Sequence, residues 1–128
     1  MEIKETMKAI HANAVEKGFF EKEKNIGEML CLIHSEISEA LEADRKGLYA
    51  NTTMIDKLKA DGFTWEDSPT SYDHAFITGV KDTFEDELAD VMIRVMDLAQ
   101  FKGIDLEKHI ELKMRYNSMR PKYHGKKY

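Results

Sequence analysis

The chain has 128 residues, the size of one ordinary domain and too short for two independent hydrophobic cores. Hydrophobic residues make up 42% and charged residues 34%, with two prolines and seven glycines. This balance predicts an ordered, helix-rich globular protein and excludes disordered and fibrous classes. The net charge of −5 argues against a basic surface for nucleic acid. We therefore expect a single domain over residues 1–128 that binds no nucleic acid.

A single cysteine, Cys31, excludes an internal disulfide and a multi-cysteine zinc site, and it suits a reducing compartment. The first residues, MEIKETMKAI, scatter charges and contain no long apolar run. We therefore expect no signal peptide and no membrane span. The expected location is the cytoplasm.

Apolar residues recur at intervals of three and four in four segments, which is the pattern of amphipathic helices. No segment alternates as a half-buried strand does. Gly18 and Gly47 stand where two of the patterns stop, and Asn25 and Asp105 stand where N-caps are needed. The sequence predicts an all-α bundle, with helices over residues 3 to 17, 25 to 47, 82 to 102 and 105 to 121.

Residues 48–80 do not follow this pattern. They contain several turn signals and a few aromatic residues, including the only tryptophan, Trp65. A structureless stretch of this length is unusual in a compact domain, so we expect a short helix near residues 54–60 within it. The segment is interpreted as an insertion or lid.

Two pairs of carboxylates stand out, Glu36 with Glu39 and Glu87 with Asp90. Residues three apart on a helix project side by side, so each pair can share a hard cation that prefers oxygen ligands. At about 100° per residue, the first acid of each pair lies about 60° from the centre of its apolar face and the second about 120°. Carboxylates at the edge of a core are costly without a partner, and two such edges in one bundle favour a bound cation.

Arg94 supports a different interpretation. It follows Asp90 by one helical turn and Glu87 by two, so its charge could neutralise part of the acidic group. The acids would then form a buried salt-bridge network in a non-catalytic helical module that associates through its apolar faces. The spacing of the residues does not separate this interpretation from the metal site.

Two segments resemble the MazG-like, all-α nucleoside triphosphate pyrophosphatases, which have a Glu-x-x-Glu helix followed by a Glu-x-x-Asp helix. They are LIHSEISEALEADRKG, from Leu32 to Gly47, and FEDELADVMIRVMDLAQFKGIDLEKHIELKMRYNSMRP, from Phe84 to Pro121. The resemblance implies a four-helix bundle with an insertion between its two metal-binding helices, and a homodimer or a dimer of dimers. It also implies Mg²⁺, with Mn²⁺ as a possible substitute, and hydrolysis of a nucleoside triphosphate to a monophosphate and pyrophosphate. The metal-binding and catalytic residues would be Glu36, Glu39, Glu87 and Asp90.

The chain departs from this family in its insertion, because 47 residues separate Glu39 from Glu87. The departure puts the substrate in doubt: an NTP, a dNTP or a phosphoribosyl nucleotide are the alternatives. Aromatic residues of the insertion could stack on a base or ribose, or they could anchor the insertion to the bundle. The candidates are Phe63, Trp65 and Tyr72.

The last predicted helix carries a stripe that changes from apolar to polar. Leu106 and Ile110 are followed at helical spacing by Lys113, Asn117 and Arg120. Such a stripe is expected to face a polar group, unless the helix leaves the bundle after Ile110 and its end is solvated. The family resemblance implies that Lys113, Asn117 and Arg120 contact the phosphates and the nucleotide.

Overall fold

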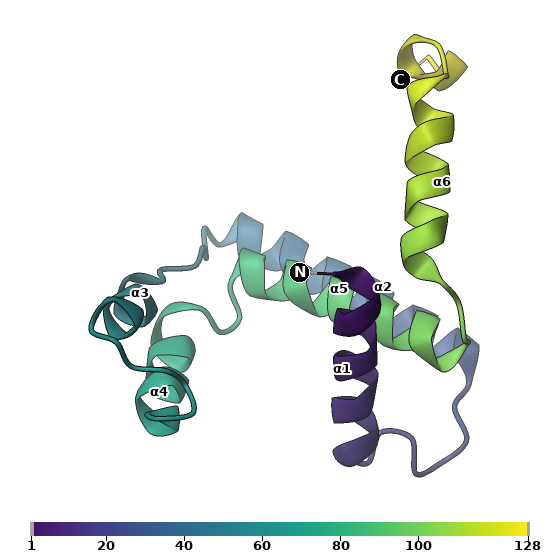
Figure 1. Cartoon of the computed structure of the whole chain (residues 1–128). Coiled ribbons are helices and arrows are strands. Elements are labelled where there is room, and N and C mark those ends of the chain that lie inside the picture. The colour runs from purple at the N-terminus through teal and green to yellow at the C-terminus, as the bar shows by residue number, and fades with distance from the viewer. Residues whose placement is uncertain (1, 128) are drawn as a thin grey trace. The chain divides into compact units, whose positions relative to one another are not determined.

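The computed structural model describes residues 2–127, and among these it contains six α-helices, one short 3-10 helix and no β-strand (Figure 1). The prediction of an all-α protein is confirmed. No helix in this part of the chain is both long and apolar enough to span a membrane. The elements are α1 (Ile3–Glu16), α2 (Ile26–Arg45), α3 (Thr53–Ala60), α4 (Pro69–Gly79), α5 (Phe84–Phe101), α6 (Leu106–Ser118) and the 3-10 helix η1 (Lys122–Gly125).

The four predicted helices correspond to α1, α2, α5 and α6, with ends that differ by a few residues. The short helix predicted in the insertion is α3, but a second helix, α4, follows it. The Ser68-Pro69 pair is one of the turn signals of residues 48–80, but the structure has a helix there. Proline is well tolerated at the first position of a helix, where its missing N–H has no partner to lose, and Pro69 opens α4 in this way.

The chain divides into two compact units, one formed by Met1–Ile26 with Val95–Tyr128 and the other by Gly27–Arg94. In the first unit, His11 of α1 contacts the C-terminal half of α5. Its Nδ1 lies 2.8 Å from Oδ1 of Asp97, and the edge of its ring packs on Phe20 with 4.7 Å between centroids. These contacts join α1 to α5 within this unit.

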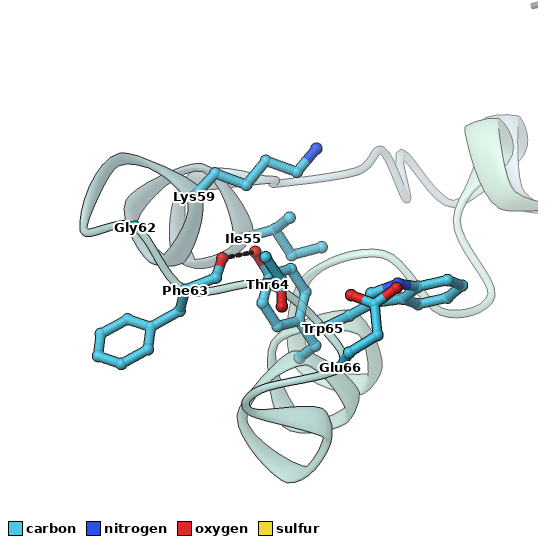
Figure 2. Close-up of a pocket in the computed structure, with 8 residues that line it drawn as sticks. Ile55, Lys59, Gly62, Phe63, Thr64, Trp65 and Glu66 are labelled. Carbon is cyan, nitrogen blue, oxygen red and sulfur yellow. Dashed lines mark hydrogen bonds between the residues drawn. The ribbon is translucent and has the colours of Figure 1, made fainter.

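In the second unit, α2 and the first part of α5, residues 84–94, lie side by side and antiparallel, and α3 and α4 form a hairpin between them in sequence (Figure 1). Two backbone hydrogen bonds join the segments that lead into and out of this hairpin. The N–H of Asn51 donates to the carbonyl of Gly79 at 2.7 Å, and the N–H of Phe84 donates to the carbonyl of Leu48 at 2.9 Å. A cavity of about 670 Å³ lies on the hairpin (Figure 2).

Small side chains dominate the buried apolar positions of the described residues, which are Met7, Ala40, Ala43, Ala75 and Ala99. Large apolar side chains of α2 and α5 are instead about half exposed. Among them are Leu30, Ile37, Leu41, Leu88 and Met92. Much of the apolar surface predicted to form the core is therefore open in the single chain.

A substitution at Gly79 tests whether the close approach of Gly79 and Asn51 at the base of the hairpin requires a glycine. A Cβ atom added at this position would overlap the backbone oxygen of Asn51, which cannot move as a flexible side chain can. We expect Gly79→Ala to lower the free energy of unfolding by about 1–3 kcal/mol, measured by urea denaturation with circular dichroism. Thr78→Ala is the matched control on the exposed side of the same helix end and should change stability by less than about 0.5 kcal/mol. Equal stability of the two variants would show that the junction does not need a glycine.

Candidate metal centre

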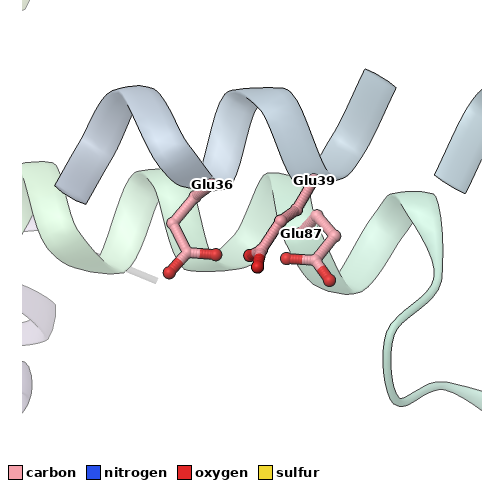
Figure 3. A group of neighbouring side chains, drawn as sticks. All are labelled: Glu36, Glu39 and Glu87. Atoms are coloured by element: carbon pink, nitrogen blue, oxygen red, sulfur yellow. The ribbon is translucent and has the colours of Figure 1, made fainter. Parts of the chain in front are cut away.

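Three carboxylates meet where α2 and α5 run side by side. One oxygen from each of Glu36, Glu39 and Glu87 lies within 4.8 Å of the others, and Figure 3 shows the three side chains directed to one place. Glu36 and Glu39 are on adjacent turns of α2, and Glu87 faces them from the first half of α5. The structure therefore brings together three of the four acids that the sequence singled out.

The acids lie closer to the centre of the buried face than predicted. On α2 the buried residues are Glu36, Ala40 and Ala43, which follow one another at intervals of four and three. This face is rotated by about 50° from the expected centre at Ile33, toward the acids. Glu36 and Glu87 are each only 7% exposed, whereas Glu39 is exposed. Two ionisable side chains are therefore largely removed from water at this site.

One cation accompanies the cluster. Nε of Arg94 donates to Oε1 of Glu36 at 2.7 Å, and the arginine side chain is 40% exposed. Among residues 2–127, no lysine, arginine or histidine forms an ion pair with Glu39, Glu87 or Asp90. A salt bridge with a basic side chain thus compensates for the charge of Glu36 but not for the charges of the other three acids.

The crowding of the acids changes their pKa values. Burial, followed by the charge of Glu39, raises the pKa of Glu87 from 4.5 to about 7. The hydrogen bond between Glu39 and Glu36 is the main cause that raises the pKa of Glu39. Burial opposes ionisation of Glu36, but its hydrogen bonds to Glu39 and Arg94 outweigh this effect and lower its pKa. Glu36 is therefore the acid of the cluster whose ionised form is favoured, whereas Glu87, with a pKa of about 7, holds a proton at slightly acid pH.

Asp90 is not among the three acids whose carboxylate oxygens lie within 4.8 Å of one another. It is half-buried one turn after Glu87, and burial and then the charge of Asp86 raise its pKa. Its own charge contributes to the raised pKa values of both Glu39 and Glu87. Asp90 therefore belongs to the same electrostatic environment, although it is not one of the three acids that meet.

The chemistry of the donor set fits a hard divalent cation. All the donors are carboxylate oxygens, which Mg²⁺ and Mn²⁺ prefer. Two of the carboxylates are buried, and only Glu36 has a basic partner among the described residues. A divalent cation would remove the like-charge repulsion that now raises the pKa of Glu87.

The predicted nucleotide-binding residues Lys113, Asn117 and Arg120 belong to the first unit. Lys113 and Arg120 both lie near the ring of Tyr116, with the charged groups 5.2 Å and 5.3 Å from its centroid. Arg120 also donates to the carbonyl of His124 at 3.0 Å. Oδ1 of Asn117 is buried and accepts no hydrogen bond within the described part of the chain. The polar stripe thus carries two cations and one buried acceptor without a partner.

The cavity on the hairpin includes residues that the sequence did and did not single out. Phe63, Trp65 and Tyr72 were predicted as candidates for stacking, and all three line the cavity. Ile55 and Lys59 of α3 also line it and were not identified, because an isoleucine and a lysine on a short exposed helix carry no distinguishing pattern.

Comparisons with protein-family models, curated proteins and solved structures find no match to this chain.

Removal of one carboxylate tests the cluster as a metal site. We expect Glu87→Gln and Glu39→Gln to weaken Mg²⁺ or Mn²⁺ binding, measured by calorimetry, by about tenfold or more, because each loses one oxygen charge from the ligand set. In chelator, both variants should melt at a higher temperature than the wild type, since like-charge repulsion is reduced. Glu36→Gln should show no such gain, because it leaves Arg94 without its carboxylate.

Glu42→Gln is the matched control for these variants. Glu42 is an exposed acid on α2 that pairs with Lys46 at 3.5 Å, outside the cluster. It should bind the cation as the wild type does. Weak binding that is the same in the wild type, in Glu87→Gln and in Glu42→Gln would contradict a metal site at the cluster.

The pKa of Glu87 also predicts how stability depends on pH. With a folded pKa of about 7 against 4.5 for an ordinary glutamate, the folded state binds more protons than the unfolded state between these values. This contribution to stability is complete below about pH 4.5 and is lost as the pH rises through about 7. In chelator, we expect the free energy of unfolding to fall by about 1–2 kcal/mol between about pH 5 and pH 8.

Glu87→Gln should flatten this pH dependence in the same urea titrations, because glutamine does not titrate. Saturating Mg²⁺ should stabilise the wild type more at pH 8 than at pH 6, since the cation competes with the proton on Glu87. A wild-type profile that rises over this range, or that Glu87→Gln leaves unchanged, would show that this carboxylate titrates as an ordinary glutamate.

Proposed function

We propose that the chain is a Mg²⁺-dependent, MazG-like nucleoside triphosphate pyrophosphohydrolase. The reaction adds water across the bond between the α- and β-phosphates and gives a nucleoside monophosphate and pyrophosphate. The observation that carries the proposal is the meeting of Glu36, Glu39 and Glu87 within 4.8 Å between two helices, with a single basic partner. The sequence motifs around these acids support the same activity.

The acidic residues would have two tasks in this reaction. Glu36, Glu39, Glu87 and Asp90 would hold the cation, which neutralises phosphate charge and makes a bound water more acidic. A carboxylate of the cluster would accept the proton of the attacking water. Arg94 would keep Glu36 ionised and fixed in orientation through the 2.7 Å hydrogen bond. Rigid helices are suited to hold such a ligand set.

The cationic residues of α6 would bind the substrate. Lys113 and Arg120 would stabilise charge on the leaving pyrophosphate, and Asn117 would hydrogen-bond the phosphate, sugar or base. The buried, unpartnered Oδ1 of Asn117 supports a polar ligand for this stripe. The substrate is an NTP or a dNTP, and a phosphoribosyl nucleotide is the related alternative.

A second copy of the chain is the proposed partner. Large apolar side chains on α2 and α5, including Leu41 and Leu88, are 51% and 46% exposed, and association would remove them from water. Cyclic dimers are the commonest solution for such faces, and a dimer of dimers extends it. We propose a cytoplasmic setting, in which the single, exposed Cys31 stays reduced.

A non-catalytic helical interaction module is the second candidate. The ion pair between Arg94 and Glu36 and the exposed apolar faces favour it, because both are expected of a scaffold that oligomerises. It gives no reason for Glu39 and Glu87 to lie unpaired beside Glu36.

A screen for pyrophosphate release over the common NTPs and dNTPs, with Mg²⁺ and with chelator, tests the proposed function. We expect release that requires the cation, and turnover lower by about two orders of magnitude or more in Glu36→Gln, Glu39→Gln, Glu87→Gln and Asp90→Asn. Lys113→Met and Arg120→Met should lower turnover and weaken nucleotide binding while Mg²⁺ binding stays near that of the wild type.

Circular dichroism of each variant separates loss of activity from loss of fold. Glu111→Gln, an exposed acid of α6 outside the polar stripe, is the control and should keep full activity. The interaction module would be favoured if the folded wild type released no pyrophosphate from any nucleotide and the carboxylate variants lost their oligomeric state.

A further inference from the structure

The cavity of about 670 Å³ on the α3–α4 hairpin is not part of the carboxylate cluster. It is within the size range of small-molecule sites, which is about 300–1,000 Å³. Residues of α3, of the loop that follows it and of α4 line it, and Figure 2 shows most of them. The lining residues are Ile55, Lys59, Gly62, Phe63, Thr64, Trp65, Glu66 and Tyr72.

The loop that carries the aromatic residues is held in place by hydrogen bonds. Oη of Tyr72 donates to the carbonyl of Phe63 at 2.7 Å. Oγ1 of Thr64 donates to Oδ2 of Asp67 at 2.8 Å, and the N–H of Asp67 donates back to Oγ1 of Thr64 at 3.1 Å. A loop fixed in this way presents its side chains with little further loss of conformational entropy on binding.

Trp65 is exposed although its loop is ordered. It is 68% exposed, and its Nε1–H donates to the carboxylate of Glu66, which fixes the orientation of the indole ring. Phe63 extends to the opposite side of the loop (Figure 2) and is 48% exposed. Aromatic residues that anchor a loop are buried, so this degree of exposure argues that Trp65 offers a face to a ligand.

The charges around the cavity favour a ring over a phosphate. Lys59 is the only basic residue of the lining, and Glu66 contributes a negative charge to the same lining. A phosphate would be repelled by Glu66 and by the nearby Asp67, whereas a heterocycle with hydrogen-bond donors and acceptors on its edge can use both a carboxylate and an ammonium group. Another cavity on this hairpin, of about 580 Å³, has no phenylalanine, tyrosine or tryptophan in its lining.

We propose that this cavity binds a nucleobase, with Trp65 as the stacking surface and Lys59 and Glu66 as partners for the edge of the base. The identification of the ring as a nucleobase rests on the proposed nucleotide substrate. Free nucleosides carry the same ring, so the base of the substrate and a separately bound nucleoside are two sources of one chemistry.

Trp65 is the only tryptophan of the chain, so its fluorescence reports directly on the cavity. The wild type is titrated with adenosine, guanosine, cytidine and uridine in chelator, which removes any contribution of the metal centre. We expect at least one nucleoside to quench the fluorescence saturably. By calorimetry, Trp65→Ala should weaken binding of that nucleoside by roughly fivefold to a hundredfold, and Trp65→Phe by much less, because stacking contributes to this extent.

Ile77→Ala is the matched control, because Ile77 is a 63% exposed apolar residue of α4 outside the cavity lining. It should bind nucleosides as the wild type does, and circular dichroism confirms that each variant is folded. Absence of saturable quenching by all four nucleosides, or equal losses in Trp65→Ala and Ile77→Ala, overturns the proposal.

Kinetic measurements with the nucleotide that releases pyrophosphate decide whether the bound base belongs to the substrate or to a separate nucleoside. If the cavity holds the base of the substrate, Trp65→Ala raises KM and leaves Mg²⁺ binding unchanged. An unchanged KM together with weakened nucleoside binding assigns the cavity to a separate nucleoside. If the wild type releases no pyrophosphate but nucleosides still quench Trp65, the proposed hydrolase fails and the nucleobase site stands.

Discussion

The contact between α2 and α5 places carboxylates of like charge at a largely buried position, and the rest of the second unit is arranged around this constraint. Glu36 and Glu87 are each 7% exposed and belong to one cluster. Such a pair opposes helix association unless a proton, a basic side chain or a metal ion compensates for the charge. Arg94 compensates for Glu36, and a raised pKa allows a proton to compensate for Glu87. Helix pairing and protonation are therefore linked equilibria at this site, and a bound cation would be linked to both.

The residues beside the acids explain how two helices can approach each other at such a site. Ala40 and Ala43 share the buried face of α2 with Glu36, and their small side chains leave room for carboxylates between the helices. The larger apolar residues of the same helix, such as Ile37 and Leu41, lie on a different face and are about half exposed. The buried face of α2 thus serves the polar site, and its exposed apolar side chains are free for association.

Periodicity predicted four of the six α-helices of the described residues and the side-by-side placement of Glu36 and Glu39, because both depend on spacing along one helix. The meeting of these two acids with Glu87 was expected only from the edge position of each acidic pair in one bundle. Periodicity could not predict the rotation of the buried face by about 50° toward the acids, since a helical projection identifies apolar residues but not which of them a neighbour covers. Pro69 opens a helix and not a turn, and its sequence context does not separate the two, because proline favours both turns and helix starts. The partner of Arg94 also depends on tertiary packing, which placed it against Glu36, 58 positions away in sequence, instead of its own helix neighbour Asp90.

The hydrogen bond from the N–H of Asn51 to the carbonyl of Gly79, 2.7 Å between N and O, joins the two ends of the α3–α4 hairpin before the chain enters α5. A segment whose ends are fixed at a constant separation can change its length and sequence without altering the register of the helices on either side, because the cost of closing a loop grows only slowly with its length. Evolution can therefore vary this hairpin as an exchangeable module. A long segment between the two acidic helices is compatible with an unchanged carboxylate cluster, and ligand preferences at the hairpin can change without loss of that cluster.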